Sequence, residues 1–521
     1  MELAENIEWR KASDRKAALI TLAFCLAWAA FGLLSVELYS DDDLGHYMIA
    51  RYSHLHPHLF LDIWGRPLFT VLYAVGSQFG LAGARLTSTV LAAAVIWFTY
   101  IYARESGIRK PWMVAMLLVV MPRFSSMAWN LDTGMALCLA LSAGLALYAK
   151  GRYAAAAAAI SLAPAGRPEG VLFIMIFGVV LLYRRQWKAI PFLFLGLALW
   201  DAAGLLMSGD PLWLLHNQPW TAPYPEKFGF DHYFKRFTEI TGPAHVPFFL
   251  AGLVVSVKRF KKGDNAALAA MWLIYFVFMV VVVWRGAFST VGLTRYFNGT
   301  TPLVALLTLA GINRVLDEEF ERLDIAATAV VAVMAGYLFY SNGPETLVIF
   351  GISTAVFAVA RILTARSPLA GRSRAAYFMI ISSMVVIAIF FTISFRPAPL
   401  TFEHARSREA ADWYLKNAKG KPVLSSNAWF AYFTDKDVYD EGQIAGVNEV
   451  NMRKARPGTV LIWEPHYAGG ERYGKVDLDR LMADPEYQLL ASDKNEFIYI
   501  FGKTGAEPPP AGLTPKDGEN K

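Results

Sequence analysis

The chain has 521 residues, of which 55% are hydrophobic, 14% aromatic and 18% charged. A soluble domain carries roughly 25% charged residues, so this composition excludes an ordinary soluble protein. The net charge of +6 comes from Lys and Arg residues that gather between apolar segments. That distribution is typical of the cytoplasmic loops of a membrane protein, and it gives no reason to expect a nucleic-acid partner.

Apolar segments recur over the first three quarters of the chain. We predict a polytopic α-helical membrane domain in residues 1–395, with about 13 transmembrane helices at roughly 20 residues each or somewhat fewer. The expected spans are Ala17–Val36, Ala84–Tyr102, Trp112–Met127, Leu131–Ala149, Tyr153–Ala165, Val171–Tyr183, Ala189–Met207, Val246–Val257, Ala266–Trp284, Arg295–Ile312, Ile325–Tyr340, Thr346–Leu363 and Ala375–Phe395.

The basic residues predict how these spans are oriented. Four Lys or Arg residues lie in Met1–Lys16, which places the N-terminus in the cytoplasm. Every predicted inner loop then carries at least two Lys or Arg residues. An odd number of spans places the C-terminus on the outer face. We expect a bacterial inner membrane, with the C-terminal domain periplasmic or extracellular.

An acidic segment, Tyr39–Arg51, follows the first span and opens an outer loop, residues 37–83. Charge where a membrane helix leaves the bilayer is costly and is often functional. Within this loop Leu68–Phe79 is apolar but short, so we expect an interfacial helix there. A second outer loop, residues 208–245, is rich in Pro, Trp, Tyr and His. This composition suits an interfacial loop that covers a substrate.

Residues 396–505 have the composition of a small α/β domain outside the membrane. Helices are expected at Glu403–Ala418 and Leu478–Ala483, and short buried strands at Pro422–Ser426, Gly458–Trp463 and Phe497–Phe501. The tail, residues 506–521, contains three consecutive prolines and a charged end. We expect it to be disordered.

The candidate chemical groups lie at the outer ends of the predicted spans. They are carboxylates with arginines nearby, namely Asp41, Asp42, Asp43, Asp132 and Glu169 with Arg66, Arg123, Arg167, Arg285 and Arg295. A carboxylate can act as a general base on a hydroxyl. Arginines can neutralise an anionic leaving group. This combination suits transfer of a group from a phosphate-linked donor to a hydroxyl.

Each signal also has a structural alternative. The three adjacent acids can be a solvated flank of the first helix, and Asp132 can complement a helix N-terminus. The Arg167–Gly170 turn can be a tight turn with proline at the first helical position. Arg285 and Arg295 can reach lipid headgroups. His54, His56 and His58 alternate like metal ligands, but loop histidines near an interface are more often solvated.

Several motifs, in order, resemble the GT-C superfamily of polyprenyl-phosphate-sugar glycosyltransferases, such as the protein O-mannosyl, aminoarabinose and arabinofuranosyl transferases. They are Asp42-Asp43 with His46-Tyr47-x-x-Ala50-Arg51, Trp64-Gly65-Arg66-Pro67-Leu68, Gly83-Ala84-Arg85-Leu86, Arg167-Pro168-Glu169-Gly170 and Thr294-Arg295-Tyr296-Phe297. The resemblance covers residues 15–315 approximately. A C-terminal soluble domain outside the membrane is common in the same superfamily.

The resemblance implies an inverting glycosyltransferase whose donor is a sugar on a polyprenyl phosphate. It places the base at Asp42 or Asp43, with Asp132 as a second acid. Arg66, Arg167, Arg285 and Arg295 become candidates for binding the donor phosphate, and His46, Tyr47, Glu169 and Tyr296 for contacting substrate. Three acids stand where the family shows a pair, so the register of the base stays open between Asp41, Asp42 and Asp43.

The expected partners are the polyprenyl-phosphate sugar, membrane lipids and an acceptor hydroxyl on a glycan, lipid or protein. No metal motif is distinct, so a requirement for Mg²⁺ or Mn²⁺ stays open and no cofactor is assigned. The alternatives are a transporter or flippase, which would need ionisable residues near mid-bilayer and discontinuous helices, and a non-catalytic membrane assembly subunit. The charges at outer span ends disfavour the transporter.

Overall fold

A computed structural model describes residues 2–38, 40–217, 228–258, 265–287, 292–316, 322–341, 344–365, 375–376, 378–386, 397–470 and 474–505. The chain divides into two compact units. The first unit contains residues 1–35 and 49–397, and the second contains residues 36–48 and 398–521. The acidic segment therefore belongs largely to the same unit as the C-terminal domain.

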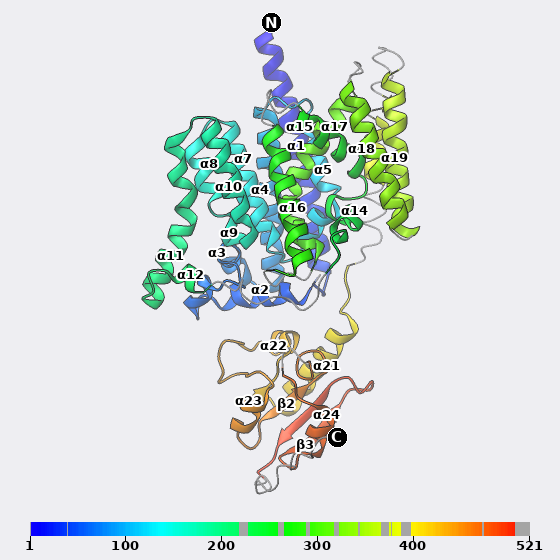
Figure 1. Ribbon diagram of the computed structural model, residues 1–521. Helices are drawn as coiled ribbons and strands as arrows, with labels where there is room; N and C mark the ends of the chain where they lie inside the picture. The colour runs from blue at the N-terminus through cyan, green and yellow to red at the C-terminus, as the bar shows by residue number, and fades with distance from the viewer. Residues whose placement is uncertain are drawn as a thin grey trace, which may run out of the picture. The chain divides into compact units, whose positions relative to one another are not determined.

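The first unit is built from helices (Figure 1). Up to residue 216 they are α1 (Glu2–Leu34), η1 (Pro57–Leu61), α3 (Pro67–Ser77), α4 (Gly80–Glu105), α5 (Met113–Val119), α6 (Pro122–Met127), α7 (Gly134–Ala149), α8 (Tyr153–Ile160), α9 (Ala163–Gly166), η2 (Pro168–Gly170), α10 (Val171–Tyr183), η3 (Trp187–Phe194), α11 (Leu195–Ser208) and α12 (Trp213–His216).

The helices that follow begin with two short ones, and those beyond residue 245 are longer except for η4. They are α13 (His232–Lys235), α14 (Phe237–Thr241), α15 (Val246–Lys258), α16 (Asn265–Arg285), η4 (Thr294–Thr300), α17 (Thr301–Val315), α18 (Arg322–Ser341) and α19 (Pro344–Ala365). Residues 375–376 and 378–386 are also helical. Helix α2 (Asp41–Tyr52) starts in the second unit, and the division between the units falls inside it.

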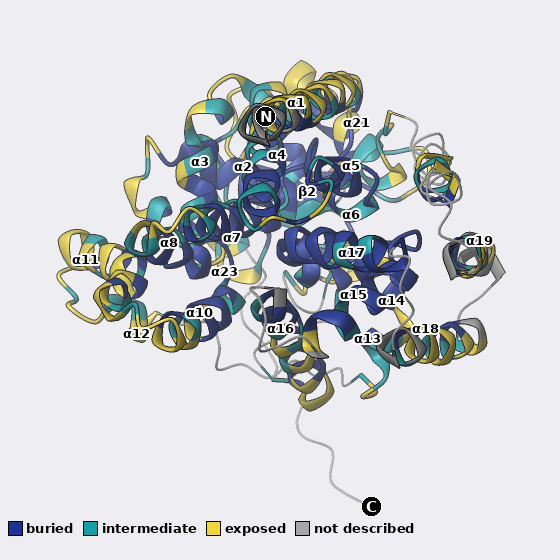
Figure 2. Ribbon diagram, turned by 90° about the horizontal axis from the view of Figure 1, so that it is seen from above, coloured by how far each residue is buried: buried dark blue, intermediate teal, exposed yellow. Residues whose placement is uncertain are grey.

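Two groups of helices form the packed centre of the first unit. Helix α4 packs against α1, α3 and α7, and α15 packs against α16, α17 and α18. Figure 2 shows α7 and α17 mostly buried, whereas α11 is mostly exposed. The exposed residues of α1 and α11 include leucines such as Leu26 and Leu206. Such apolar surfaces are stable only against an apolar solvent, which the acyl chains of a bilayer provide.

Among the described residues, four helical segments are long and apolar enough to cross a membrane. They are Arg10–Leu34, Gly80–Glu105, Trp187–Ser208 and Ala266–Arg285, and seven apolar helices are shorter. These helices agree with the expected polytopic membrane fold, while the predicted number of spans and the bounds of the membrane domain stay predictions.

Prolines break two of the predicted spans. The segment expected at residues 112–127 is divided into α5 and α6, and Met121 between them has ψ 116°. Proline disfavours a helical residue before it, and Pro122 follows directly. The segment expected at residues 153–165 is likewise divided into α8 and α9, with Pro164 in the first turn of α9.

Most of the acidic segment, expected as part of a loop, is helical, and Asp41, Asp42 and Asp43 form the first turn of helix α2, the acidic turn. Negative side chains stabilise a helix N-terminus. Asp43 also accepts a hydrogen bond from the backbone N–H of Ser40 at 3.2 Å, as in a capping box. The apolar segment expected at residues 68–79 forms α3, so a helix lies there as predicted.

The second unit contains a four-stranded sheet in the order β1-β2-β4-β3. Strands β1 (Val423–Leu424) and β2 (Val460–Trp463) are parallel, while β4 (Tyr499–Lys503) is antiparallel to both β2 and β3 (Tyr487–Ser492). The helices are α21 (Phe402–Asn417), α22 (Ala428–Phe433), α23 (Glu449–Lys454) and α24 (Leu478–Ala483). The core includes Leu461, Trp463 and Phe501.

The predicted helices at residues 403–418 and 478–483 match α21 and α24, and the three predicted strands overlap β1, β2 and β4. Strand β3 is missing from the prediction because most of its residues are at least partly exposed, so it has no buried apolar run. The predicted tail, residues 506–521, lies outside the described residues. So do residues 218–227 of the second outer loop and 387–396 at the end of the last predicted span.

Candidate active site

The Arg167–Gly170 turn buries two charged side chains inside the first unit. Arg167 is extended, and Pro168 starts the short helix η2. A Cβ atom on Gly170 would overlap the backbone of Ala163, so only glycine allows η2 to lie this close to α9. Arg167 and Glu169 form a buried ion pair, with Nε donating to Oε1 at 2.7 Å. The turn is therefore a packed polar site and not an exposed loop.

Arg66 lies beside this pair. It interacts electrostatically with Arg167, Glu169 and Tyr296. Its Nη1 donates to the carbonyl of Ile63 at 2.6 Å, but its Nε is buried and has no hydrogen-bond partner. Two guanidinium groups in one buried site repel each other and favour an anion between or beside them.

The backbone of Arg66 is strained. Its φ is 59° and its ψ is 96°, and Pro67 follows as the first residue of α3. The carboxylate of Asp62 supports the turn by accepting from the N–H of Gly65 at 2.5 Å. A non-glycine residue in such a conformation costs free energy, and strain of this kind gathers at functional sites.

Asp132 joins the start of α7 to η4. One carboxylate oxygen accepts from the N–H of Gly134 at 2.6 Å, and the other accepts from Nδ2 of Asn298 at 2.7 Å. The next residue, Thr133, accepts from Arg167 Nη1 at 3.0 Å. Asp132 thus stabilises the N-terminus of α7, as its structural interpretation predicted. It also interacts electrostatically with Arg167.

Aromatic side chains form one wall of the same site. The Arg167 guanidinium lies over the ring of Tyr296, 5.1 Å from its centroid. The hydroxyl of Tyr275 donates to the backbone carbonyl of Tyr296 at 2.6 Å. Tyr233 is fully buried and interacts with Tyr296 and Glu169. These contacts fix η4 and its Tyr296 against the ion pair.

The structure thus brings Arg66, Asp132, Arg167, Glu169 and Tyr296 together in the first unit. Arg295 is half-buried, one residue before Tyr296. Arg285 is exposed at the end of α16, where its guanidinium lies 4.5 Å from the ring centroid of Trp284.

The other predicted residues, Asp42, Asp43, His46 and Tyr47, belong to the second unit. Asp43, His46 and Tyr47 are buried there, and the ring of Tyr47 meets Tyr432 edge-on at 5.9 Å. Asp42 is half-buried in the first turn of α2. Contacts within the second unit therefore hold the acidic turn in a defined place.

Asp41 differs from its two neighbours. Its carboxylate accepts hydrogen bonds from Tyr467 at 2.7 Å and Trp429 at 3.3 Å, and it pairs with His404 at 2.9 Å. Burial alone would raise the pKa of Asp41, but the hydrogen bonds from His404 and Tyr467 outweigh it and lower this pKa to about 2. A carboxylate with so low a pKa is a weak base near neutral pH.

Sequence reasoning missed Thr133 and Asn298 in the first unit and Glu37 and His404 in the second. Thr133 is adjacent to a predicted residue, but no pattern singles out its hydroxyl. Asn298 is buried, and its Oδ1 has no hydrogen-bond donor. His404 lies far along the chain from the acids that it contacts, so spacing could not reveal it.

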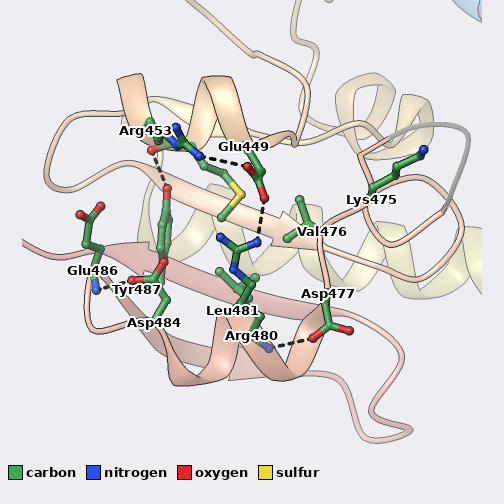
Figure 3. Close-up of a pocket in the computed structure, with 11 residues that line it drawn as sticks. Glu449, Arg453, Lys475, Val476, Asp477, Arg480, Leu481, Asp484, Glu486 and Tyr487 are labelled. Atoms are coloured by element: carbon green, nitrogen blue, oxygen red, sulfur yellow. Dashed lines mark hydrogen bonds and ion pairs between the residues drawn. The ribbon is translucent and has the colours of Figure 1, made fainter. Parts of the chain in front are cut away.

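The described residues contain no group of three His, Cys, Asp or Glu side chains arranged to hold a metal ion. A small pocket lies in the second unit between α23, α24 and β3 (Figure 3). Its Glu449 pairs with Arg480 at 2.8 Å and with Arg453 at 3.1 Å. None of the predicted site residues lines it, and its Glu449 carboxylate is already paired with two arginines.

The chain has the fold of two solved structures of ArnT from Cupriavidus metallidurans. The structure bound to undecaprenyl phosphate matches with a TM-score of 0.60 and 15% sequence identity, over 94% of this chain and 98% of the other. The apo structure matches with a TM-score of 0.59 and 13% identity, over 93% and 97%. The fold that the predicted resemblance implied is therefore shared with these two solved structures.

The matches extend over both units of the chain, because they cover nearly its whole length. No protein-family model matches the sequence, and no curated protein matches it. At this identity the similarity concerns the fold, and the reaction must be argued from the site.

Proposed function

We propose that this chain is an inverting membrane glycosyltransferase that moves a sugar from a polyprenyl phosphate to a hydroxyl acceptor. Two observations support the proposal. The chain shares its fold with ArnT over nearly its whole length, and one of those ArnT structures holds undecaprenyl phosphate. The first unit also contains two neighbouring arginines, Arg66 and Arg167, and the buried Nε of Arg66 has no hydrogen-bond acceptor within the described residues.

The observation that carries the proposal is the unpartnered Nε of Arg66 beside Arg167. A buried guanidinium nitrogen without an acceptor is costly in the free protein. An anionic oxygen placed there supplies the acceptor and relieves the repulsion between the two arginines. A phosphate attached to a lipid provides such an oxygen in a membrane. Glu169 neutralises part of the charge and orients Arg167.

The proposed reaction is an in-line displacement. A carboxylate on the first turn of α2, Asp42 or Asp43, takes the proton from the acceptor hydroxyl. The acceptor oxygen forms a bond to the anomeric carbon while the bond from that carbon to the phosphate oxygen breaks, and the configuration inverts. Polyprenyl phosphate leaves with the electron pair, and Arg66 and Arg167 stabilise its developing charge. Arg285 and Arg295 remain further candidates for this phosphate.

The neighbouring polar groups suit a sugar. Asn298 Oδ1 is a buried acceptor without a donor, and sugar hydroxyls are donors. Tyr296 presents a ring beside the arginines. We assign Asp132 to this site as the group that orients Asn298, and His46 and Tyr47 to positioning the acidic turn.

The proposal includes the setting of the reaction. The base and the arginines act at the outer face of a bacterial inner membrane, with the N-terminus in the cytoplasm. The acceptor is a hydroxyl on a glycan, lipid or protein. The outer loop at residues 208–245 covers the donor, and the C-terminal domain orients the acceptor.

The experiment is donor turnover. Purified full-length protein is incubated with a panel of polyprenyl-phosphate sugars and hydroxyl acceptors, and released polyprenyl phosphate is measured by mass spectrometry. Parallel reactions contain EDTA, Mg²⁺ or Mn²⁺, which decides the metal requirement. We expect one donor to be consumed, and we expect Asp42→Asn or Asp43→Asn to lower turnover about 10²- to 10⁴-fold, the range for loss of a general base.

The asparagine variants are suitable because asparagine still accepts a hydrogen bond at a helix N-terminus. Asp412→Asn is the matched control, since Asp412 is an exposed carboxylate on α21 in the same unit. Turnover that survives both substitutions would move the base away from α2. Absence of turnover with every donor and acceptor class would contradict the proposed function.

A further inference from the structure

A second polar cluster lies in the second unit, and the proposed reaction does not use it. The chain just before α2 is tied to the start of the C-terminal domain, because the N–H groups of Val36 and Glu37 both donate to the carbonyl of Ala398, at 3.0 and 3.1 Å. The Glu37 carboxylate accepts from the N–H of Thr401 at 2.8 Å. These bonds bring the first turn of α21 next to the acidic turn.

His404 lies on that first turn of α21 and bridges two carboxylates. Its Nδ1 is 2.7 Å from Glu37 Oε2, and its Nε2 is 2.9 Å from Asp41 Oδ1. A carboxylate only accepts hydrogen bonds, so both ring nitrogens must donate, which requires the imidazolium form. Each carboxylate faces a different nitrogen, so the three groups form a bridge and do not surround a metal.

The surroundings hold the bridge in one geometry. The His404 ring stacks on Trp429, with 4.6 Å between centroids, and the indole N–H of Trp429 donates to the same Asp41 oxygen at 3.3 Å. Tyr467 donates to the other Asp41 oxygen at 2.7 Å. The buried carboxylate of Glu464 accepts from the N–H groups of His466, Tyr467 and Ala468 in the turn that carries Tyr467. The side chains of His404 and Glu37 are only 11% and 6% exposed.

The charges agree with this geometry. Burial alone would lower the pKa of His404, but its hydrogen bonds to Asp41 and Glu37 outweigh burial and raise this pKa to about 9. Burial would raise the pKa of Glu37, and the bond from His404 instead lowers it. Two further titratable groups, Glu403 and His466, are exposed in the same unit and contact each other at 3.3 Å. Burial raises the pKa of Glu464, whose carboxylate accepts from the backbone of the Tyr467 turn.

We propose that His404 is a positioning residue for the transferase reaction, because its bridge from Glu37 to Asp41 fixes the acidic first turn of α2 that carries Asp42 and Asp43. His404 is not itself a catalytic residue. The expected effect of His404 on turnover rests on the proposed function, but the bridge can be tested independently of that function. It also gives the C-terminal domain a specific role, namely to hold the acidic turn.

The bridge is tested by hydrogen exchange of the full-length protein in detergent. His404→Gln removes the cation and one of the two hydrogen bonds. Exchange at residues 41–48 should become about tenfold faster or more, because local opening becomes easier. Arg453→Gln is the matched control, since it breaks the ion pair with Glu449 on the exposed surface of the same unit. It should leave the exchange at residues 41–48 unchanged.

The positioning role is tested by kinetics of the same variants. Loss of alignment lowers kcat, so we expect His404→Gln to lower kcat about tenfold or more while KM for the donor changes less than about twofold. Wild-type kcat should fall as the pH rises through 9, since His404 then loses its proton, and His404→Gln should lack this fall. Asp41→Asn and His404→Gln should be non-additive when combined, because both break one bridge.

The outcomes separate the two proposals. Unchanged exchange at residues 41–48 in His404→Gln overturns the bridge. Faster exchange with unchanged kcat and an unchanged pH profile overturns the positioning role. If the wild type consumes no donor and His404→Gln still shows faster exchange at residues 41–48, the bridge exists and the proposed function fails.

Discussion

At the scale of single residues, Arg66 combines three unfavourable features. Its φ is positive, its Nε is buried without an acceptor, and a second guanidinium lies close to it. Backbone strain of this kind costs about 1–3 kcal/mol. We infer that the free energy of binding an anionic ligand offsets these three costs, which Arg66 carries in the free protein.

Arg66 is also a better probe of the phosphate site than Arg167. Arg167 shares a buried ion pair with Glu169, and removing one partner of a buried pair leaves an uncompensated charge that costs about 3–5 kcal/mol. Loss of activity in an Arg167 variant would therefore be confounded by loss of folding.

We predict that Arg66→Gly and Arg66→Ala lose activity equally but differ in stability. Glycine adopts positive φ without penalty, so this variant should be more stable than Arg66→Ala by about 1 kcal/mol. Both variants lack the guanidinium and should lose donor turnover by about 10²- to 10³-fold. Thermal unfolding in detergent and the donor-turnover assay measure the two quantities on the same samples.

The comparison of the two variants isolates the backbone, because each removes the same charged group. Equal stability of Arg66→Gly and Arg66→Ala would show that the turn carries no strain. Wild-type turnover in either variant would remove Arg66 from the phosphate site.

At the scale of elements, glycines set how closely the central helices approach. A Cβ atom on Gly311 of α17 would overlap the carbonyl oxygen of Phe248, and one on Gly252 of α15 would overlap that of Leu307. Small residues of this kind let membrane helices pack backbone against backbone. The contact between α15 and α17 therefore depends on both positions.

Gly311→Ala should destabilise the protein by about 1–3 kcal/mol, because the added methyl group overfills the contact and forces the helices apart. Gly336→Ala is the control, since Gly336 lies in α18 and a methyl group added there would meet no atom within 4 Å. Alanine is the better helix former there, so the control should be neutral or slightly stabilising. Thermal unfolding in detergent measures both, and equal midpoints would contradict the close packing.

Long apolar elements of this chain could be predicted from sequence because hydropathy alone identifies them. The segments expected at residues 84–102 and 266–284 correspond to α4 and α16. Breaks within apolar runs are harder, since hydropathy continues through Pro122 and Pro164 while the helix does not. Helix α2 was not expected because three adjacent acids are typical of a loop unless they occupy a helix N-terminus.

The candidate site shows the same division. The Arg167–Gly170 turn and Tyr296 could be found from local motifs, and the structure brings them together. Asn298 and His404 could not be found from sequence, because each is recognised only by its contact with a residue far along the chain. His404 contacts Asp41 across more than 360 intervening positions, and a single sequence contains no signal for such a pair.

At the scale of the whole molecule, the orientation in the membrane is a testable consequence of the basic loops. An odd number of predicted spans separates residue 152 from the C-terminal domain, so the two should lie on opposite sides. Arg152 and Lys419 are exposed and suitable for cysteine substitution. The native Cys25 is half-buried in α1, and Cys138 is buried in α7, which keeps background labelling low.

We predict that Lys419→Cys reacts with a membrane-impermeant maleimide in intact spheroplasts, whereas Arg152→Cys reacts only after the membrane is opened. The physical reason is that loops rich in Lys and Arg stay in the cytoplasm. The parent protein without added cysteine is the control and should not be labelled. Labelling of both variants in intact spheroplasts would mean that an even number of spans separates them, and the reverse pattern would place the acidic turn's unit in the cytoplasm and exclude a reaction at the outer face.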